Sequence, residues 1–216
     1  MSRGLFVVLT LLVLSAALFA GWWSNRRAVY FPVELQSAYG LCESRWAPPD
    51  RQQVQDDFEA NWYANELANL EEPSLFARPP GSPRSVRFTW LRSFHDPIAV
   101  RIDATAEGRL QMTARRNPIG NDLYPYAQDP RLRRLSRFLT AQEATELELL
   151  LERTGALAAP SSGCRCCLDG ALWIVESSDP RHGYRYHSSQ SPDAGLERQI
   201  GEFFLSLTGW NVEPVY

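Results

Sequence analysis

Lysine is absent from this chain, and all 22 of its basic residues are arginine. With 25 acidic residues the formal net charge is -3, so the sequence lacks the basic excess that is typical of nucleic-acid binding. We therefore expect no nucleic-acid partner. The arginines are scattered along the chain, which indicates general composition and not a ligand clamp, because a clamp needs several that converge.

Motifs for catalysis and cofactor binding are also missing. The sequence contains no Gly-rich phosphate loop, no His-Glu-x-x-His zinc motif, no dinucleotide fingerprint and no Gly-x-Ser-x-Gly turn. There are only three histidines, and paired carboxylates are not evident. We therefore predict no cofactor and no metal, and we favour a binding or structural role over an enzyme.

Charge is absent from residues 4–23, a run about as long as the helix that spans a bilayer. Trp22 and Trp23 stand where an interfacial aromatic belt would lie, which favours a retained membrane anchor. The rival interpretation is a cleaved signal peptide, with the small residues 15–17 as its cleavage site. Residues 1–27 are thus predicted to be an anchor or signal, 28–48 a connector, and 49–216 one α+β domain.

The membrane is therefore an expected partner of the N-terminal segment. The predicted location is the bacterial inner membrane, crossed once, with the domain in the periplasm. Secretion after signal cleavage is one alternative. A cytoplasmic-facing domain is the other, because Arg26 and Arg27 outweigh Arg3 and draw the C-terminal side of the segment inward.

The rest of the chain mixes strand and helix patterns. Alternating β-formers predict strands near residues 86–92, 98–103, 109–114, 171–176 and 184–188, with another within 131–139. Short turns between successive strands predict one mainly antiparallel sheet. Helices are predicted from Pro49 to before Pro73, from the capping box at Thr140 to Gly155, and from Asp193 to Gly209.

The expected fold class is therefore α+β, with the sheet packed by two or three helices. Helical spacing assigns five residues of the first helix to its apolar face: Val54, Phe58, Trp62, Leu67 and Leu70. Trp173 and Phe203 are predicted to lie in the core between the sheet and the later helices.

The four cysteines are Cys42, Cys164, Cys166 and Cys167, an even number that predicts disulfides behind an export signal. A bond between adjacent cysteines would be strained, so the preferred pairs are Cys164 with Cys167 and Cys42 with Cys166. Free or unpaired thiols are one alternative to these disulfides. The spacing Cys-x-x-Cys leaves two others open, a redox site and a metal site, with His182 and His187 as the nearest further ligands.

Five residues are the candidates for a binding site: Arg92, His95, Asp169, Trp173 and Glu176. His95 precedes Asp96 and could serve a hydrolase, although a turn residue that caps backbone groups explains it more simply. Asp169 likewise reads as a turn residue before a strand. Tyr124 and Tyr126 lie in a loop rich in Asn, Pro and Gly and are expected to be exposed.

Several segments together resemble an uncharacterised family of small bacterial α+β proteins. They are residues 61–67, 72–75, the sequence WLRSFHDP at 90–97, LDGALWIVE at 168–176, and Ser191 with Pro192. The resemblance covers about residues 58–210 and implies one α+β unit, but the family has no established activity. The chain departs from the family pattern at 188–190 and by its cysteine cluster.

Three functional hypotheses follow. The first is a membrane-anchored envelope domain that binds a protein or small-molecule ligand or has a structural role. The second is a hydrolase that uses His95 with Asp96, Asp169 or Glu176. The third is a thiol redox or metal protein centred on residues 164–167.

Overall fold

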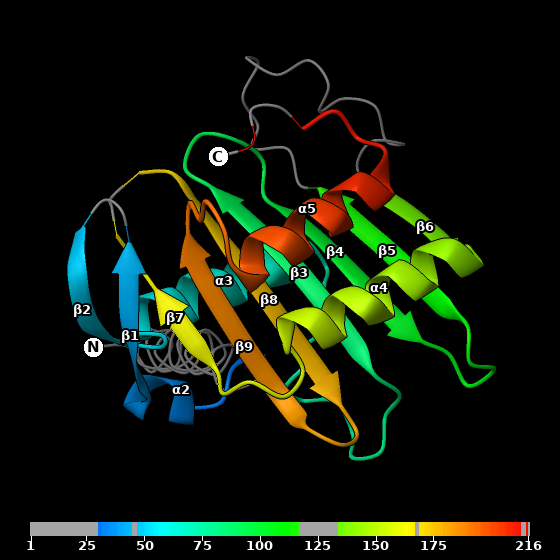
Figure 1. Ribbon diagram of the computed structural model, residues 1–216, viewed down its shortest axis with the longest axis horizontal. Coiled ribbons are helices and arrows are strands. Elements are labelled where there is room, and N and C mark those ends of the chain that lie inside the picture. The colour runs from blue at the N-terminus through cyan, green and yellow to red at the C-terminus, as the bar shows by residue number, and fades with distance from the viewer. Residues whose placement is uncertain (1–29, 45–46, 117–133, 167–168, 213–214, 216) are drawn as a thin grey trace, which may run out of the picture.

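The computed structural model describes residues 30–44, 47–116, 134–166, 169–212 and 215, and its main feature is a seven-stranded sheet (Figure 1). The strand order is β6-β5-β4-β3-β8-β9-β7, and only β7 and β9 pair in parallel. The strands are β3 (Ser85–Arg92), β4 (Ile98–Ala104), β5 (Leu110–Arg116), β6 (Arg134–Phe138), β7 (Ser162–Cys164), β8 (Ala171–Asp179) and β9 (Gly183–Gln190). The predicted α+β class with a mainly antiparallel sheet is confirmed.

Two helices cover one face of the sheet. Figure 1 shows α4 (Ala141–Thr154) and α5 (Leu196–Thr208) in front of the strands. The even-numbered residues of β3 and the odd-numbered residues of β8 point toward them, because successive side chains of a strand alternate between faces. Trp173 is fully buried there, which confirms its predicted place in the core, whereas Phe203 is only partly buried and packs against the core.

Both helices have the ends that the sequence indicates, with one exception. Thr140 and Glu143 form the capping box of α4, and Gly155 ends that helix in the left-handed conformation. Gly209 ends α5 in the same way. The predicted cap at Asp193 is wrong, because Gly195 precedes the first turn of α5 and no side chain caps it.

The other face carries α3 (Asp57–Asn69), which Figure 1 shows behind the sheet, and the one-turn helix α2 (Glu34–Ser37). The predicted start of α3 near Pro49 is wrong, because Pro49 and Asp50 belong to strand β2 (Ala47–Gln53), which pairs with β1 (Tyr39–Ser44). Asp56 and Glu59 form the true capping box, seven residues later than predicted.

The apolar face of α3 also differs from the prediction. Its buried side consists of Ala60, Tyr63, Ala64 and Leu67, together with the hydrogen-bonded Glu59. Phe58 is 73% exposed and Trp62 is 40% exposed, so both face away from the core. Val54, Leu67 and Leu70 are buried as expected. Packing through small alanines lets the helix approach the sheet closely, and the two large aromatic rings remain outside.

The segment predicted as an irregular connector is folded from Tyr30 onward. Phe31 and Leu35 are buried in the core between α3 and the sheet, and β1 lies against β7. The predicted membrane segment at 4–23 and the loop residues Tyr124 and Tyr126 lie outside the described residues. No helix among the residues that the structure does describe is long and apolar enough to cross a membrane.

Gly201 provides a test of the packing between α5 and the sheet. A Cβ atom at this position would lie 2.4 Å from Cε3 of Trp173 and 2.6 Å from Cε2 of Phe88. Gly201→Ala should therefore lower the free energy of unfolding by about 1–3 kcal/mol, although alanine favours helices intrinsically. Urea denaturation measures the change.

Gly40→Ala is the matched control, since no atom lies within 4 Å of a Cβ built at Gly40. Its effect should be much smaller. A Gly201→Ala protein that is as stable as the parent would show that α5 does not approach Trp173 as described.

Candidate functional site

Three of the predicted site residues gather at one end of the sheet. Arg92 ends β3 opposite Ala171, and the amide of Ser93 donates to the carbonyl of Gly170 at 3.0 Å, so His95 and Asp169 belong to neighbouring turns. Arg92 is buried, lies 4.3 Å from the ring centroid of Trp90, and donates to the carbonyl of Asp96 at 2.9 Å. Its contacts thus tie the turn to β3.

His95 is half-buried next to Asp96 in this turn. Burial lowers the pKa of His95, and the positive charges of Arg92 and Arg116 lower it further, while Asp96 opposes them. The carboxylate of Asp96 is buried and held by Arg116 at 2.9 Å. Asp96, one of the three carboxylates that the hydrolase hypothesis offers to His95, is therefore engaged in an ion pair with Arg116.

Glu176 and Trp173 lie elsewhere. Glu176 is opposite Arg87 in the register, five residues along β3 from Arg92, which corresponds to roughly 16 Å along the strand. It points to the α3 side of the sheet, where Arg87 and Tyr184 donate to it, and Trp173 points to the α5 side. The five predicted residues do not form one site.

The cysteines pair differently from the prediction. Cys42 of β1 is bonded to Cys164 of β7, with 4.8 Å between the Cα atoms, so the predicted pairs Cys42 with Cys166 and Cys164 with Cys167 are wrong. The reason is that β1 lies beside β7, whereas Cys166 follows the end of β7 and turns toward Gln190. Cys166 is a free thiol, and Cys167 lies outside the described residues.

His187 joins two elements near the disulfide-bonded strand β7. Its Nε2 lies 3.1 Å from the carbonyl of Ala156, so Nε2 carries the proton and Nδ1 accepts from the hydroxyl of Ser162 at 2.9 Å. Burial lowers the pKa of His187, which favours this neutral form. With 1% exposure it connects the end of α4 to the sheet. No group of three metal-ligating side chains occurs among the described residues.

The candidate site is a groove of about 230 Å³ between the start of α3 and the end of the sheet where β8 begins. We call it the α3 groove. Phe58 and Trp62 stand one helical turn apart on its α3 side, with ring centroids 6.1 Å apart. Its lining consists of Asp56, Phe58, Glu59, Trp62, Tyr63, Leu91, Ser93, Arg165, Gly170, Leu172 and Gln190.

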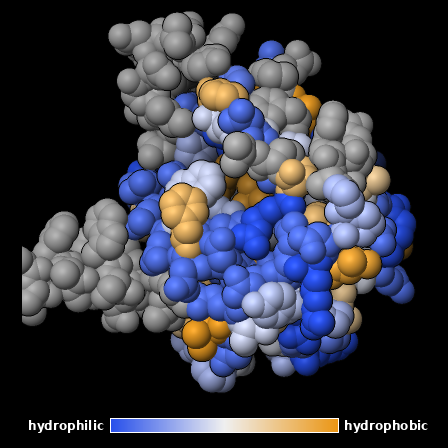
Figure 2. Space-filling model, turned by 90° about the vertical axis from the view of Figure 1, so that its left-hand side faces the viewer, coloured by the Kyte–Doolittle hydropathy of each residue, from blue (hydrophilic) through white to orange (hydrophobic). Residues whose placement is uncertain are grey.

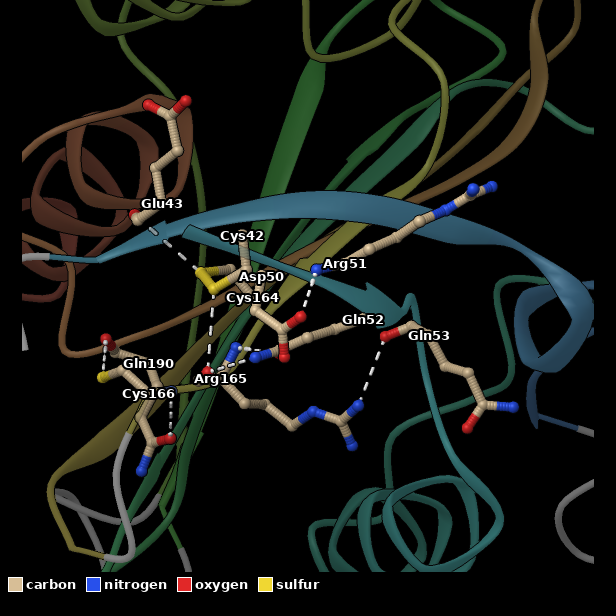
Figure 3. The surroundings of a disulfide bond; sticks show 10 residues. All are labelled: Cys42, Glu43, Asp50, Arg51, Gln52, Gln53, Cys164, Arg165, Cys166 and Gln190. Atoms are coloured by element: carbon tan, nitrogen blue, oxygen red, sulfur yellow. Dashed lines mark hydrogen bonds between the residues drawn. A yellow bond between two sulfur atoms is a disulfide. The ribbon is translucent and has the colours of Figure 1, made fainter. Parts of the chain in front are cut away.

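Arg165 holds the two sides of the α3 groove together. Its Nη1 donates to Asp56 and to Glu59, both at 2.8 Å, so it binds the capping box of α3. The side-chain amide of Gln52 binds the backbone of Arg165 twice. Its oxygen accepts from the backbone N–H of Arg165 at 3.0 Å, and its nitrogen donates to the carbonyl of Arg165 at 2.9 Å. Figure 3 shows the contacts between Gln52 and Arg165 beside the Cys42–Cys164 bond, which fixes the strand just before Arg165.

Two titratable groups form part of the wall. Burial raises the pKa of Glu59, and hydrogen bonds from Asp56 and Tyr63 and the charge of Arg165 oppose this effect. Tyr63 donates its hydroxyl proton to Glu59 at 2.8 Å. Burial, followed by Tyr186 and Glu59, raises the pKa of Tyr63 far above its ordinary value, so it stays a donor. The Glu59 carboxylate and the Tyr63 hydroxyl are therefore hydrogen-bonded to each other within the wall.

Sequence reasoning missed this site for two reasons. Phe58 and Trp62 fit a helical stripe of apolar residues, but Ala60 and Ala64 fit a second stripe of the same helix, and that second stripe is the buried one. Arg165 stands between two cysteines, and nothing in the pattern of the sequence marks it as a site residue. The informative signal was the strong N-cap at Asp56, which fixes where the helix begins and therefore which face points inward.

Comparisons with known proteins add no family. The chain matches no protein-family model, and no curated protein is significantly similar to it.

The disulfide assignment generates a direct prediction. Cys42→Ser or Cys164→Ser should lower the free energy of unfolding by about 4–5 kcal/mol, because the bond closes a loop with a sequence separation of 122 residues. Cys166→Ser is the matched control and should leave the bond intact. Denaturation of oxidised protein compares the three variants.

Peptide mapping without reductant should recover a fragment that joins Cys42 to Cys164. A fragment that joins Cys42 to Cys166 would contradict the assignment, as would four free thiols in protein taken from its native compartment.

Proposed function

We propose that this chain is a membrane-anchored envelope domain that binds a ligand in the α3 groove, without catalysis. The observation that carries the proposal is the exposure of Phe58 and Trp62 beside that groove. Exposed aromatic pairs beside a concave surface are typical of binding sites, because a partner that covers them removes a large apolar area from water. Fully burying one such ring contributes about 1.5–3 kcal/mol.

Location outside the cytoplasm is supported by two features. The Cys42–Cys164 bond is of the kind that persists in oxidising compartments. The uncharged run at 4–23 is long enough to anchor the domain to the membrane. Few residues separate this run from the folded domain, since the described fold starts at Tyr30. A site on this domain would therefore work close to the membrane surface.

A binding role agrees with the state of the polar groups in the groove. Asp56, Glu59 and Tyr63 are held in hydrogen bonds with one another and with Arg165, so none of them is poised as a nucleophile or a base. Such a preorganised polar wall fixes a ligand at little entropic cost. The rings of Phe58 and Trp62 supply contact area, and the wall supplies orientation.

The test uses the full chain in lipid nanodiscs, isotopically labelled for NMR detection of the tryptophan indole N–H groups. The probes are three pools of ten-residue peptides, basic, neutral and acidic, with equal aromatic content. At least one pool should shift the Trp62 signal. Phe58→Ser should raise the Kd of that pool at least tenfold, a loss of about 1.4 kcal/mol.

Leu149→Ser is the matched control, because Leu149 is also exposed, at 58%, but lies on α4 at the opposite face. The Leu149→Ser variant should bind the same peptide pool with the Kd of the parent protein. The proposed function is wrong if no pool shifts the Trp62 signal, or if Phe58→Ser and Leu149→Ser bind equally well.

A further inference from the structure

The α3 groove adjoins a second hollow at Phe58. This second, more open hollow of about 730 Å³ lies between α2 and α3, and Asp56 and Phe58 line both. Its lining consists of Val33, Glu34, Gln36, Ser37, Gln53, Asp56, Asp57 and Phe58. The two hollows together form a track on either side of one exposed ring, and such a track suits an extended segment better than a compact ligand.

The charges along this track are mainly negative. The two linings contain four carboxylates, Glu34, Asp56, Asp57 and Glu59, and one guanidinium, that of Arg165. The charge of Arg165 is directed at two of these carboxylates, at 2.8 Å each. Glu34 and Asp57 add exposed negative charge near Phe58. A cationic ligand is therefore attracted along the track, and an anionic ligand is repelled.

The start of α3 would ordinarily favour an anion, because the first amides of a helix are positively polarised. In α3 the carboxylates of the capping box occupy the place of such an anion. The side chain of Asp56 accepts from the amide of Glu59 at 2.8 Å, and Glu59 accepts from the amide of Asp56 at 3.0 Å. An incoming ligand meets carboxylates at this helix end.

The exposed rings favour the same ligand chemistry. The cationic groups of arginine and lysine are attracted to aromatic faces within about 6 Å, and their methylene stems cover apolar surface. Figure 2 shows that the side of the molecule with β1, β2 and α2 is mainly hydrophilic, with separate hydrophobic patches. That surface suits a charged partner better than a continuous apolar one.

We propose that the occupant of this track is a basic peptide segment of a partner protein, with arginine or lysine side chains packed against Phe58 and Trp62 and directed at the carboxylates. In an extended segment, alternate side chains on one face are about 7 Å apart, so such a segment can place cations on both sides of one ring. This inference rests on the proposed function.

The test compares three ten-residue peptides of one design, with arginine, glutamine or glutamate at alternate positions, on the full chain in nanodiscs. The arginine peptide should shift the Trp62 signal with the lowest Kd, and its Kd should rise with salt, because surface charges are screened. The double variant Glu34→Gln, Asp57→Asn should weaken the arginine peptide on the order of fivefold and leave the glutamine peptide unchanged.

The matched control is Glu146→Gln with Glu152→Gln, which removes two exposed carboxylates from α4. It should leave all three affinities unchanged. If the glutamine or glutamate peptide binds the α3 groove as tightly as the arginine peptide, the charge inference is overturned while the proposed function stands. If no peptide shifts the Trp62 signal, both are overturned.

The Trp62 signal also identifies a different occupant. A shift that depends on protein concentration in the absence of peptide would assign the track to a second copy of the chain, and would overturn the proposal.

Discussion

The guanidinium of Arg87 is fully buried between the sheet and the segment that joins α3 to β3. It donates to Glu176 at 2.6 Å and to the carbonyl of Pro73, and the buried Glu72 lies 3.7 Å away. Burial lowers the pKa of Arg87, but the two carboxylates outweigh it and the net shift is upward. An unpaired charge here would cost several kcal/mol, so the α3–β3 connection must stay where its partners are.

The α3 groove depends on this constraint. Glu72 also pairs with Arg101 of β4, at 2.8 Å, so the buried charges attach the end of α3 to the centre of the sheet. At the other end of α3, Arg165 holds the capping box, and the Cys42–Cys164 bond fixes the strand before Arg165. With both ends of the helix attached, Phe58 and Trp62 have a fixed position in front of the groove.

Much of the fold could be predicted because its signals are local. The capping box of Thr140, the terminal Gly155 and the alternation in β3 to β5 need only neighbours in sequence. The cysteine pairing could not be predicted, since it depends on the contact between β1 and β7, whose bonded cysteines are 122 residues apart in the sequence. The groove could not be predicted either, because the spacing of apolar residues cannot decide which of the two stripes of α3 faces the core. The burial of Arg87 and Glu72 could not be predicted, because charged residues usually lie on the surface.

A double-mutant cycle on Arg87 and Glu176 tests most directly whether the buried pair holds the fold together. Arg87→Met and Glu176→Met should each lower the free energy of unfolding by about 3–5 kcal/mol, since each leaves a buried charge with too few partners. The double variant should be less destabilised than the sum of the two by at least about 2 kcal/mol, measured by urea denaturation of the full chain. Strictly additive losses would contradict the account, because the two side chains would then not depend on each other.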